Sequence, residues 1–284
     1  MLLITFGQSI GLPIPDWDTI GTATHLYDEL TEDFSVHYID VGKADAIYLH
    51  YQDFDMLIDA GVDSTSSQVN KYIRQFGIAQ LDLVVATHPD KDHIGGMANI
   101  IEDFDIDLFW EPQLNPDIVP DTEAYRGMCE ALASQSVQIE KAHAGISYDT
   151  DNISIDVLSP MGLYNSTNAS SIVLKIKFGG TSFLFMGDAE QENEWELLDT
   201  GANISADILK IGHHGSKTSS TEEFLRAVNP QIAIISVGPD KNNLPAEIIL
   251  NRLEELTIPY YRTDINGNIV IYSDGHDFNI QTEK

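Results

Sequence analysis

Four side chains of the types that bind metal ions lie within one short segment of this sequence. His88, Asp90, Asp92 and His93 follow the apolar run LDLVVAT, and a Gly-Gly pair comes shortly after them. Imidazoles and carboxylates are ligands for ions such as Zn²⁺ and Mn²⁺. Groups this crowded would repel one another or stay unpaired unless a cation lay among them. A polar loop of solvated aspartates is the alternative, but such a loop needs neither histidines nor paired glycines.

The local chain can bring these side chains to one point. Pro89 favours an extended conformation at His88, and in extended chain residues two apart face the same way. His88, Asp90 and Asp92 can therefore converge, and His93 can turn in as the loop curls. The glycines let the next helix start close to the site.

Two later segments place further polar groups directly after apolar runs. Asp188 follows TSFLFMG, where a turn or helix cap is the alternative to a metal ligand. His213 and His214 follow ADILKIG, with Ser216 and Lys217 after them. Adjacent histidines beside a glycine, with Lys217 next, could hold or protonate a phosphate oxygen. A pair of ordinary exposed histidines is the alternative.

The elements that must position these groups interleave along the chain from about residue 34. The patterns predict strands at 35–41, 46–51, 55–60, 81–87, 153–159, 171–178, 181–187, 206–212, 231–238 and 268–273. They predict helices at 68–77, 189–199, 218–228 and 245–256. A capping box of Ser219 and Glu222 is expected in the third helix. Strands in both halves with helices between them predict an α+β fold of two packed sheets covered by helices.

The length of 284 residues and the 43% hydrophobic content suffice for a substantial core. Residues 1–33 are expected to form an N-terminal arm or extra strand, and 34–284 the functional domain. No run approaches the roughly 18 apolar residues of a membrane span, and the N-terminus lacks the basic leader of a signal peptide. We therefore expect a soluble, cytoplasmic chain without a membrane partner, with secretion left open and oligomeric state undetermined.

The net charge of −30 bears on partners. Such a surface repels polyanions, and no cluster of basic residues offers a stripe for a phosphate backbone. The charge therefore disfavours nucleic acid without excluding it. Salt adaptation would produce the same composition. The single cysteine, Cys129, excludes an internal disulfide framework and is expected to be a small buried helix residue.

The motifs together resemble the metallo-β-lactamase superfamily. His-x-Asp-x-Asp-His-x-Gly-Gly at 88–96 is similar to its signature, with aspartate in place of the usual second histidine. That replacement is typical of the branch containing the hydrolase domain of competence-type DNA-uptake proteins and the phosphorylcholine esterases. The resemblance covers about residues 34–272 and implies a four-layer αββα sandwich. The matching segments, in the family's order, are HYIDVGKADAIYL, MLIDAG, the signature itself, NASSIVLKI, FLFMGDAE, ILKIGHHGSKTSS and AIISVG.

The resemblance also implies roles for the matched residues. His88 and Asp90 would serve one divalent ion, Asp92 and His93 a second, and Asp188 would bridge both. The implied cofactor is one or two divalent ions, Zn²⁺ or Mn²⁺.

The remaining polar residues are assigned to the substrate or to the support of the ligands. Asp45 and Asp59 could orient ligand histidines from behind, and each could equally be a turn residue. Asp92, Asp188, His213 and His214 are the candidate catalytic residues, and the two histidines are assigned to substrate and transition state more than to metal. The candidate substrate-binding residues are His213, His214, Ser216, Lys217, Asn168 and Ser171. A strand-entry turn is the alternative for the last two.

This sequence departs from the family at two places. Relatives carry a His-Pro pair after the strand that matches AIISVG, and its histidine completes the second metal site, but Leu244 stands there in this chain. Either Asp240 or Asn243 substitutes, or the second site is weak or empty. Relatives also favour Gly-Gln-Gly-Asp where this chain has GKAD at 42–45.

The sequence therefore predicts a metal-dependent hydrolase. The favoured function is a phosphodiesterase that uses metal-bound hydroxide on a small phosphodiester or nucleotide-type substrate. The alternatives are a nuclease acting on single-stranded DNA and a binding or regulatory module that has lost turnover. A β-lactamase proper is a weaker, third alternative.

Overall fold

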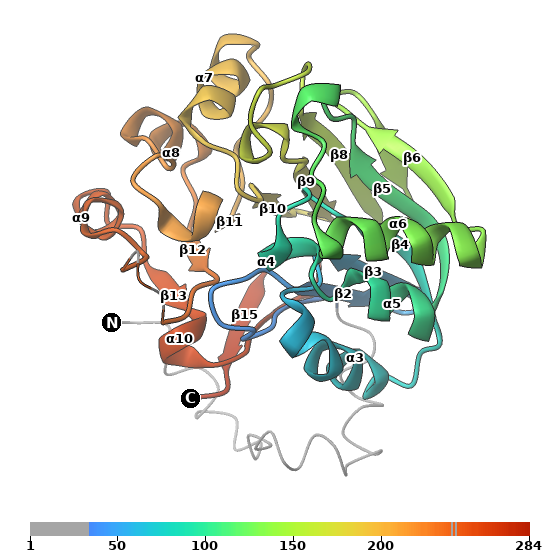
Figure 1. The fold of residues 1–284 in the computed structure, drawn as a ribbon. Coiled ribbons are helices and arrows are strands. Elements are labelled where there is room, and N and C mark those ends of the chain that lie inside the picture. The colour runs from blue at the N-terminus through green and yellow to red at the C-terminus, as the bar shows by residue number, and fades with distance from the viewer. Residues whose placement is uncertain (1–33, 240, 242) are drawn as a thin grey trace, which may run out of the picture.

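Two β-sheets packed face to face, with helices on both outer surfaces, make up the described part of the chain (Figure 1). The computed structural model describes residues 34–239, 241 and 243–284. Within these residues the strand orders are β15-β14-β1-β2-β3-β4-β5-β6 and β13-β12-β11-β10-β9-β8-β7. The predicted four-layer αββα sandwich is confirmed. The expected N-terminal arm, residues 1–33, lies outside the described residues.

The elements have the following bounds. The first sheet contains β1 (Phe34–Tyr38), β2 (Ile47–Tyr51), β3 (Phe54–Ile58), β4 (Gln80–Val85), β5 (Asp105–Pro112), β6 (Gln138–Ala142), β14 (Ile269–Ser273) and β15 (Phe278–Thr282). The second contains β7 (Ser147–Asp149), β8 (Ile153–Ser159), β9 (Val173–Phe178), β10 (Thr181–Phe185), β11 (Ile208–Lys210), β12 (Ile232–Ile235) and β13 (Tyr260–Arg262). The α-helices are α3 (Ser66–Arg74), α4 (Lys91–Ile94), α5 (Met97–Asp103), α6 (Glu123–Gln135), α7 (Gln191–Asp199), α8 (Glu222–Val228), α9 (Glu247–Glu255) and α10 (Thr263–Asn266). Short 3-10 turns lie at η1 (Asp63–Thr65), η2 (Pro116–Ile118), η3 (Asn168–Ser170) and η4 (Gly212–Gly215).

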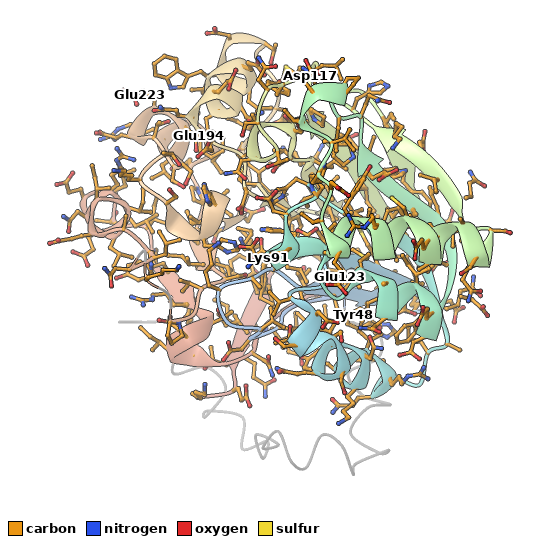
Figure 2. All side chains as sticks on the ribbon, in the orientation of Figure 1. Tyr48, Lys91, Asp117, Glu123, Glu194 and Glu223 are labelled. Carbon is orange, nitrogen blue, oxygen red and sulfur yellow. The ribbon has the colours of Figure 1, made fainter. Side chains whose placement is uncertain are left out.

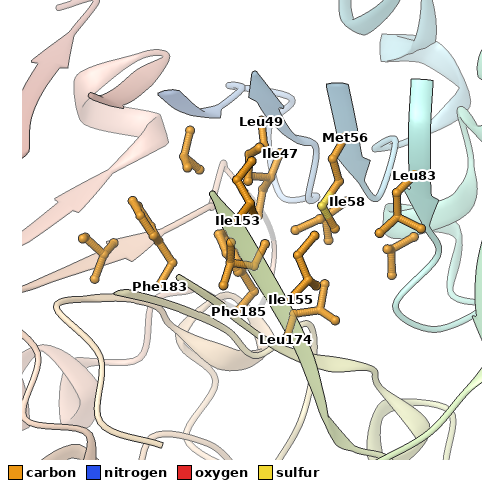
Figure 3. Close-up of a cluster of buried hydrophobic side chains, with 14 of the residues drawn as sticks. Ile47, Leu49, Met56, Ile58, Leu83, Ile153, Ile155, Leu174, Phe183 and Phe185 are labelled. Carbon is orange, nitrogen blue, oxygen red and sulfur yellow. The ribbon is translucent and has the colours of Figure 1, made fainter. Parts of the chain in front are cut away.

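The central core lies between the two sheets. Alternating apolar residues point inward, as period-2 geometry requires. In β8, for example, Ile153 and Ile155 are buried, whereas Ser154 between them is partly exposed. Figure 3 shows Ile58 and Leu83 of the first sheet facing such residues, with Phe183 from the second. Burial of each such side chain contributes roughly 1.5–3 kcal/mol. This core fixes the two sheets against each other.

Two outer layers bury the remaining sheet faces. Helices α3, α5 and α6 cover the first sheet with side chains such as Ile73 and Ile100. Helices α7, α8 and α9 cover the second with Leu197, Leu225 and Leu253. Figure 1 shows the two helix groups on opposite sides of the molecule. Each predicted strand and helix is confirmed, although several are shorter than predicted.

The expected capping box of α8 is wrong. The helix begins at Glu222, and its N-cap is Thr221, whose hydroxyl oxygen accepts the N–H of Phe224 at 3.4 Å. Ser219 is buried and donates its hydroxyl to the carbonyl of Gly212 at 2.8 Å. A left-handed residue at 220, with φ of 53°, separates Ser219 from the helix. The serine therefore supports the loop after β11 and not the helix start.

The expected burial of Cys129 is also wrong. The residue lies on α6 as predicted, but it is exposed. The buried face of this helix is formed by Met128, Ala131 and Leu132, and Cys129 lies beside that face. Across the described part of the chain, none of the helices combines the length and apolar character needed to cross a membrane.

Candidate metal centre

Ends of parallel strands in both sheets meet at one edge of the sandwich. In the first sheet β3 and β4 are parallel, with Ile58 paired to Val85. In the second, β10, β11 and β12 are parallel. Asp59 follows β3, His88 follows β4, and Asp188 follows β10. The carboxyl ends of parallel strands are the usual location of sites in such sheets, so chemistry-bearing residues far apart in sequence collect here.

Gly187 allows the two sheets to approach at this edge. It has a φ of 53°, a conformation that L side chains rarely adopt. A Cβ at this position would lie 3.1 Å from Cβ of Thr87. Residues 87–88 and 187–188 can therefore come together across the interface between the sheets.

The carboxylate of Asp188 lies between two groups of side chains. Its Oδ1 is 3.2 Å from Nε2 of His93 and 3.5 Å from Nε2 of His214. Its Oδ2 is 3.7 Å from Nε2 of His88 and 3.7 Å from Nε2 of His213. Asp188 could therefore serve as a metal ligand on both sides. Asp188 is not a helix cap, because the N-cap of α7 is Glu190.

The other predicted ligands are divided between the same two sides. Asp90 Oδ2 lies 3.9 Å from Nε2 of His88, on the Oδ2 side of Asp188. Asp92 Oδ2 lies 3.7 Å from Nε2 of His214, on the Oδ1 side. The extended chain ends at Asp90, and Asp92 and His93 come in from the first turn of α4. The structure thus brings together all five residues that the resemblance assigned to metal.

Several of these atoms need a partner. Nε2 of His88, His93 and His214 and Oδ1 of Asp188 are buried and lack a hydrogen-bond partner among the described residues. Each buried polar atom without a hydrogen-bond partner costs about 1–3 kcal/mol. Because these four atoms surround one point, a single bound group could pair with all of them. Burial, reinforced by His93, lowers the pKa of His88 to about 4, which leaves a neutral ring able to ligate. The donor set therefore fits one or two divalent ions.

Hydrogen bonds at the opposite ring nitrogens hold the imidazoles in place. Nδ1 of His93 lies 2.7 Å from Oδ2 of Asp59, and Nδ1 of His214 lies 2.9 Å from the carbonyl of Ser236. Nδ1 of His88 lies 3.1 Å from Oγ1 of Thr87, whose hydroxyl donates to Asp59 at 2.7 Å. When Nδ1 carries the proton, Nε2 presents its lone pair to the centre. Asp59 therefore orients ligand-type histidines, as expected.

Removing the charge of Asp59 is expected to weaken metal binding. In an Asp59→Asn variant the amide N–H faces Nδ1 of His93 and favours the tautomer whose proton is on Nε2, which cannot ligate. We expect Mn²⁺ or Zn²⁺ affinity, measured by calorimetric titration, to fall by about 10- to 100-fold. Asp63→Asn, a charge-matched change at an exposed residue, should leave it unaltered. Equal affinities in both variants would contradict this role.

Asp45 has a partner that the sequence analysis missed. Its Oδ2 lies 2.9 Å from Nζ of Lys210, and both side chains are almost fully buried. Burial would raise the pKa of Asp45, but Lys210 and His214 lower it, so the carboxylate stays charged. A lysine at the end of the buried strand β11 was the available signal, because a buried ammonium needs a carboxylate.

The adjacent histidines have different environments. Both have left-handed backbone, with φ of 48° at His213 and 51° at His214, a conformation that is costly outside glycine and concentrates at functional sites. The side chain of His213 is 22% exposed, and its Nδ1 lies 3.2 Å from Glu190. His214 is fully buried among the ligand-type groups. His214 therefore faces the metal groups, and its predicted contact with substrate stays a prediction.

The other residues assigned to substrate are divided similarly. Ser171 is fully buried, and its hydroxyl oxygen accepts the N–H of Asp188 at 3.2 Å, so it supports Asp188. Asn168 Nδ2 lies 3.4 Å from Nδ1 of His213. Ser216 is half-buried beside Thr218, and Lys217 is exposed.

Leu244 occupies the position where relatives carry a metal-binding histidine. Leu244 packs against the apolar cluster under α9. His214 provides the imidazole on that side, where it forms a potential ligand set with Asp92 and His93. Of the proposed substitutes, Asp240 lies outside the described residues.

Comparisons with known proteins agree with this architecture. The family model of the metallo-beta-lactamase superfamily matches residues 39–238. The chain is 33% identical to ComE operon protein 3 of Bacillus subtilis over 86% of this chain and 34% of that protein. It is 28% identical to competence protein ComA of Neisseria gonorrhoeae over 80% and 30% of the two chains. The chain thus spans about a third of the length of these relatives.

A solved structure has the same fold at low sequence identity. The metallo-beta-lactamase fold protein YhfI from Bacillus subtilis superposes with a TM-score of 0.56 and 11% sequence identity, over 85% of this chain and 100% of that one. With the family match, the paired sheets and the ligand-type groups at their shared edge, the conclusion is that this chain belongs to the metallo-β-lactamase superfamily.

Proposed function

We propose that this chain is a metal-dependent phosphodiesterase that acts on a small phosphodiester or nucleotide-type substrate. The observation that carries the proposal is the buried Asp188 carboxylate, which has Nε2 of His88 near one oxygen and Nε2 of His93 and His214 near the other. His88, Asp90 and Asp188 would hold one divalent ion. Asp92, His93, His214 and Asp188 would hold a second. When bound, such ions lower the pKa of water and polarise a phosphoryl oxygen.

The chain's own side chains would complete the chemistry. Asp92 and Asp188 would orient the attacking water through their carboxylate oxygens. His213 is the partly exposed imidazole of the site, and Glu190 holds its Nδ1 at 3.2 Å. That contact leaves Nε2 to protonate the leaving oxygen or to stabilise charge developing on it. Asn168, beside the same ring, would help position the substrate, with Ser216 and Lys217 at the outer edge.

The ligand set also bears on which ion is used. Three carboxylates and three imidazoles form a harder donor set than the three histidines of many zinc hydrolases, because carboxylate oxygen favours ions such as Mn²⁺. We therefore propose Mn²⁺ as a rival to Zn²⁺. Elemental analysis of the purified chain, followed by titration of the metal-free protein with each ion, distinguishes them.

The net negative charge of the chain favours a small substrate. A net charge of −30 repels a long polyanion outside the site but has little effect on a molecule with a single phosphodiester. Single-stranded DNA is the second candidate, and it is favoured by the similarity to proteins named for competence. This second candidate also predicts that cleavage rises steeply with salt, because screening weakens the repulsion.

A substrate panel tests the proposal. We expect bis(p-nitrophenyl) phosphate to be cleaved when Mn²⁺ or Zn²⁺ is added and not in the presence of EDTA. Nucleotide and choline phosphodiesters should be cleaved faster than single-stranded DNA. Faster cleavage of DNA would favour the nuclease, and turnover of nitrocefin would favour a β-lactamase. A protein without bound metal and without activity on any of these would favour the binding module.

A further inference from the structure

We propose that Lys43 is a tethered cation that weakens the metal site on the Oδ1 side of Asp188, so that two divalent ions bind with unequal affinity. The inference rests on the metal centre of the proposed function and not on its substrate. It concerns the site formed by Asp92, His93 and His214, which we call the lysine-side site.

Lys43 is in direct contact with a candidate metal ligand, Asp92. The ammonium of Lys43 forms a hydrogen-bonded ion pair with Oδ2 of Asp92. The same oxygen lies 3.7 Å from Nε2 of His214. The two side chains are only 23% and 15% exposed, so solvent screens the pair incompletely. An oxygen needed as a metal ligand is therefore already paired with a positive charge.

The backbone keeps Lys43 beside the centre. The N–H of Asp45 donates to the carbonyl of Asp92 at 3.1 Å, which ties the loop after β1 to α4. The loop is also packed closely against the chain after β12, where a Cβ on Gly238 would lie 2.5 Å from Cα of Gly42. Ala44, the next residue, is 1% exposed. The loop cannot move outward without breaking these contacts, although the lysine side chain can rotate.

Charge then distinguishes the two sides of Asp188. A divalent ion in the lysine-side site must either break the ion pair between Asp92 and Lys43 or bind next to the ammonium of Lys43. Either event lowers the affinity of the site for the ion. Lys210 is also near, but its charge is balanced by Asp45 at 2.9 Å. On the other side, Asp90 is more open, with a side chain 41% exposed, and lies next to His88. The site of His88 and Asp90 is therefore expected to fill first.

Titration of the metal-free full chain with Mn²⁺ tests the proposal. The Lys43→Gln substitution removes the positive charge and keeps a side chain of similar length. We expect wild type to bind a tight and a weaker equivalent. In Lys43→Gln the weaker equivalent should tighten by about tenfold or more, which corresponds to about 1.4 kcal/mol. Lys91→Gln is the matched control, because Lys91 is the neighbour of Asp92 on α4 and is exposed (Figure 2). Its weaker equivalent should stay within about twofold of wild type.

A second background separates the specific contact from other effects. In an Asp92→Asn chain the ion pair is absent, so adding Lys43→Gln should tighten Mn²⁺ binding by less than it does in the wild-type background. Circular dichroism and thermal melts confirm that each variant is folded. An unchanged or weaker second equivalent in Lys43→Gln, or equal tightening in Lys91→Gln, overturns the proposal while leaving the metal centre intact. Failure of both wild type and Lys43→Gln to bind Mn²⁺ overturns the inference together with the metal centre.

Discussion

A chain carrying both His88→Ala and Asp92→Ala is expected to hydrolyse bis(p-nitrophenyl) phosphate at least about a thousandfold more slowly than wild type. His88 lies near Oδ2 of Asp188, whereas Asp92 lies near His214, which faces Oδ1 of Asp188. Removing one from each side damages both potential metal sites in a single protein. The initial rate of p-nitrophenolate release at saturating Mn²⁺ measures the loss.

The control uses the same residue types away from the centre. His143→Ala with Asp121→Ala removes one imidazole and one carboxylate from exposed positions, so its rate should stay within about twofold of wild type. Circular dichroism checks that both double variants are folded. If the His88/Asp92 variant keeps a tenth or more of the wild-type rate, the hydrolytic site lies elsewhere.

Metal binding is expected to raise the melting temperature by about 7 °C at a metal concentration a thousand times the dissociation constant. At that ratio, an ion that binds only the folded chain stabilises it by about 4 kcal/mol. The entropy of unfolding for a chain of this length converts that energy to the stated shift. The physical source is the set of unpaired atoms on His88, His93, His214 and Asp188, which folding buries together.

Thermal melts with EDTA and with added Mn²⁺ or Zn²⁺ measure this shift. Asp188→Asn should lose more than half of it, because Asp188 faces both groups through its two oxygens. Glu222→Gln, at an exposed residue that pairs with Arg226, should keep the full shift. Identical melting temperatures with and without metal would argue against ion binding at these atoms.

Local patterns were sufficient for most of the fold because they reflect local physics. Alternating apolar residues such as Ile153 and Ile155 gave β8, and the run before His88 gave β4. Strands with weak patterns were missed. Strand β6 is QIEKA at a sheet edge, and mostly polar residues with partial exposure carry no period-2 signal. Strand β13 has only three residues, too few to show a period.

Tertiary contacts decided the points at which the sequence-based predictions were wrong. Ser219 and Glu222 have the spacing of a capping box, but the hydroxyl of Ser219 donates its hydrogen bond to the carbonyl of Gly212. Cys129 has helical spacing, but which face of α6 is buried depends on the neighbouring helix α5 and the sheet. The hydrogen bond from the N–H of Asp188 to the hydroxyl oxygen of Ser171 was likewise not visible in the sequence.

The sequence by itself determined the ligand types and the strand ends that carry them, because His88, Asp90, Asp92, His93 and Asp188 directly follow apolar runs. Only the tertiary structure decided which ligand-type side chains lie near each oxygen of Asp188, because that arrangement depends on how the edges of the two sheets meet. It also distinguished His213, which is partly exposed, from His214, which is buried among the ligand-type groups. The pairing of Lys43 with Asp92 likewise joins loops that are distant in sequence. Residue type and order are local properties, whereas distance between side chains is set by packing.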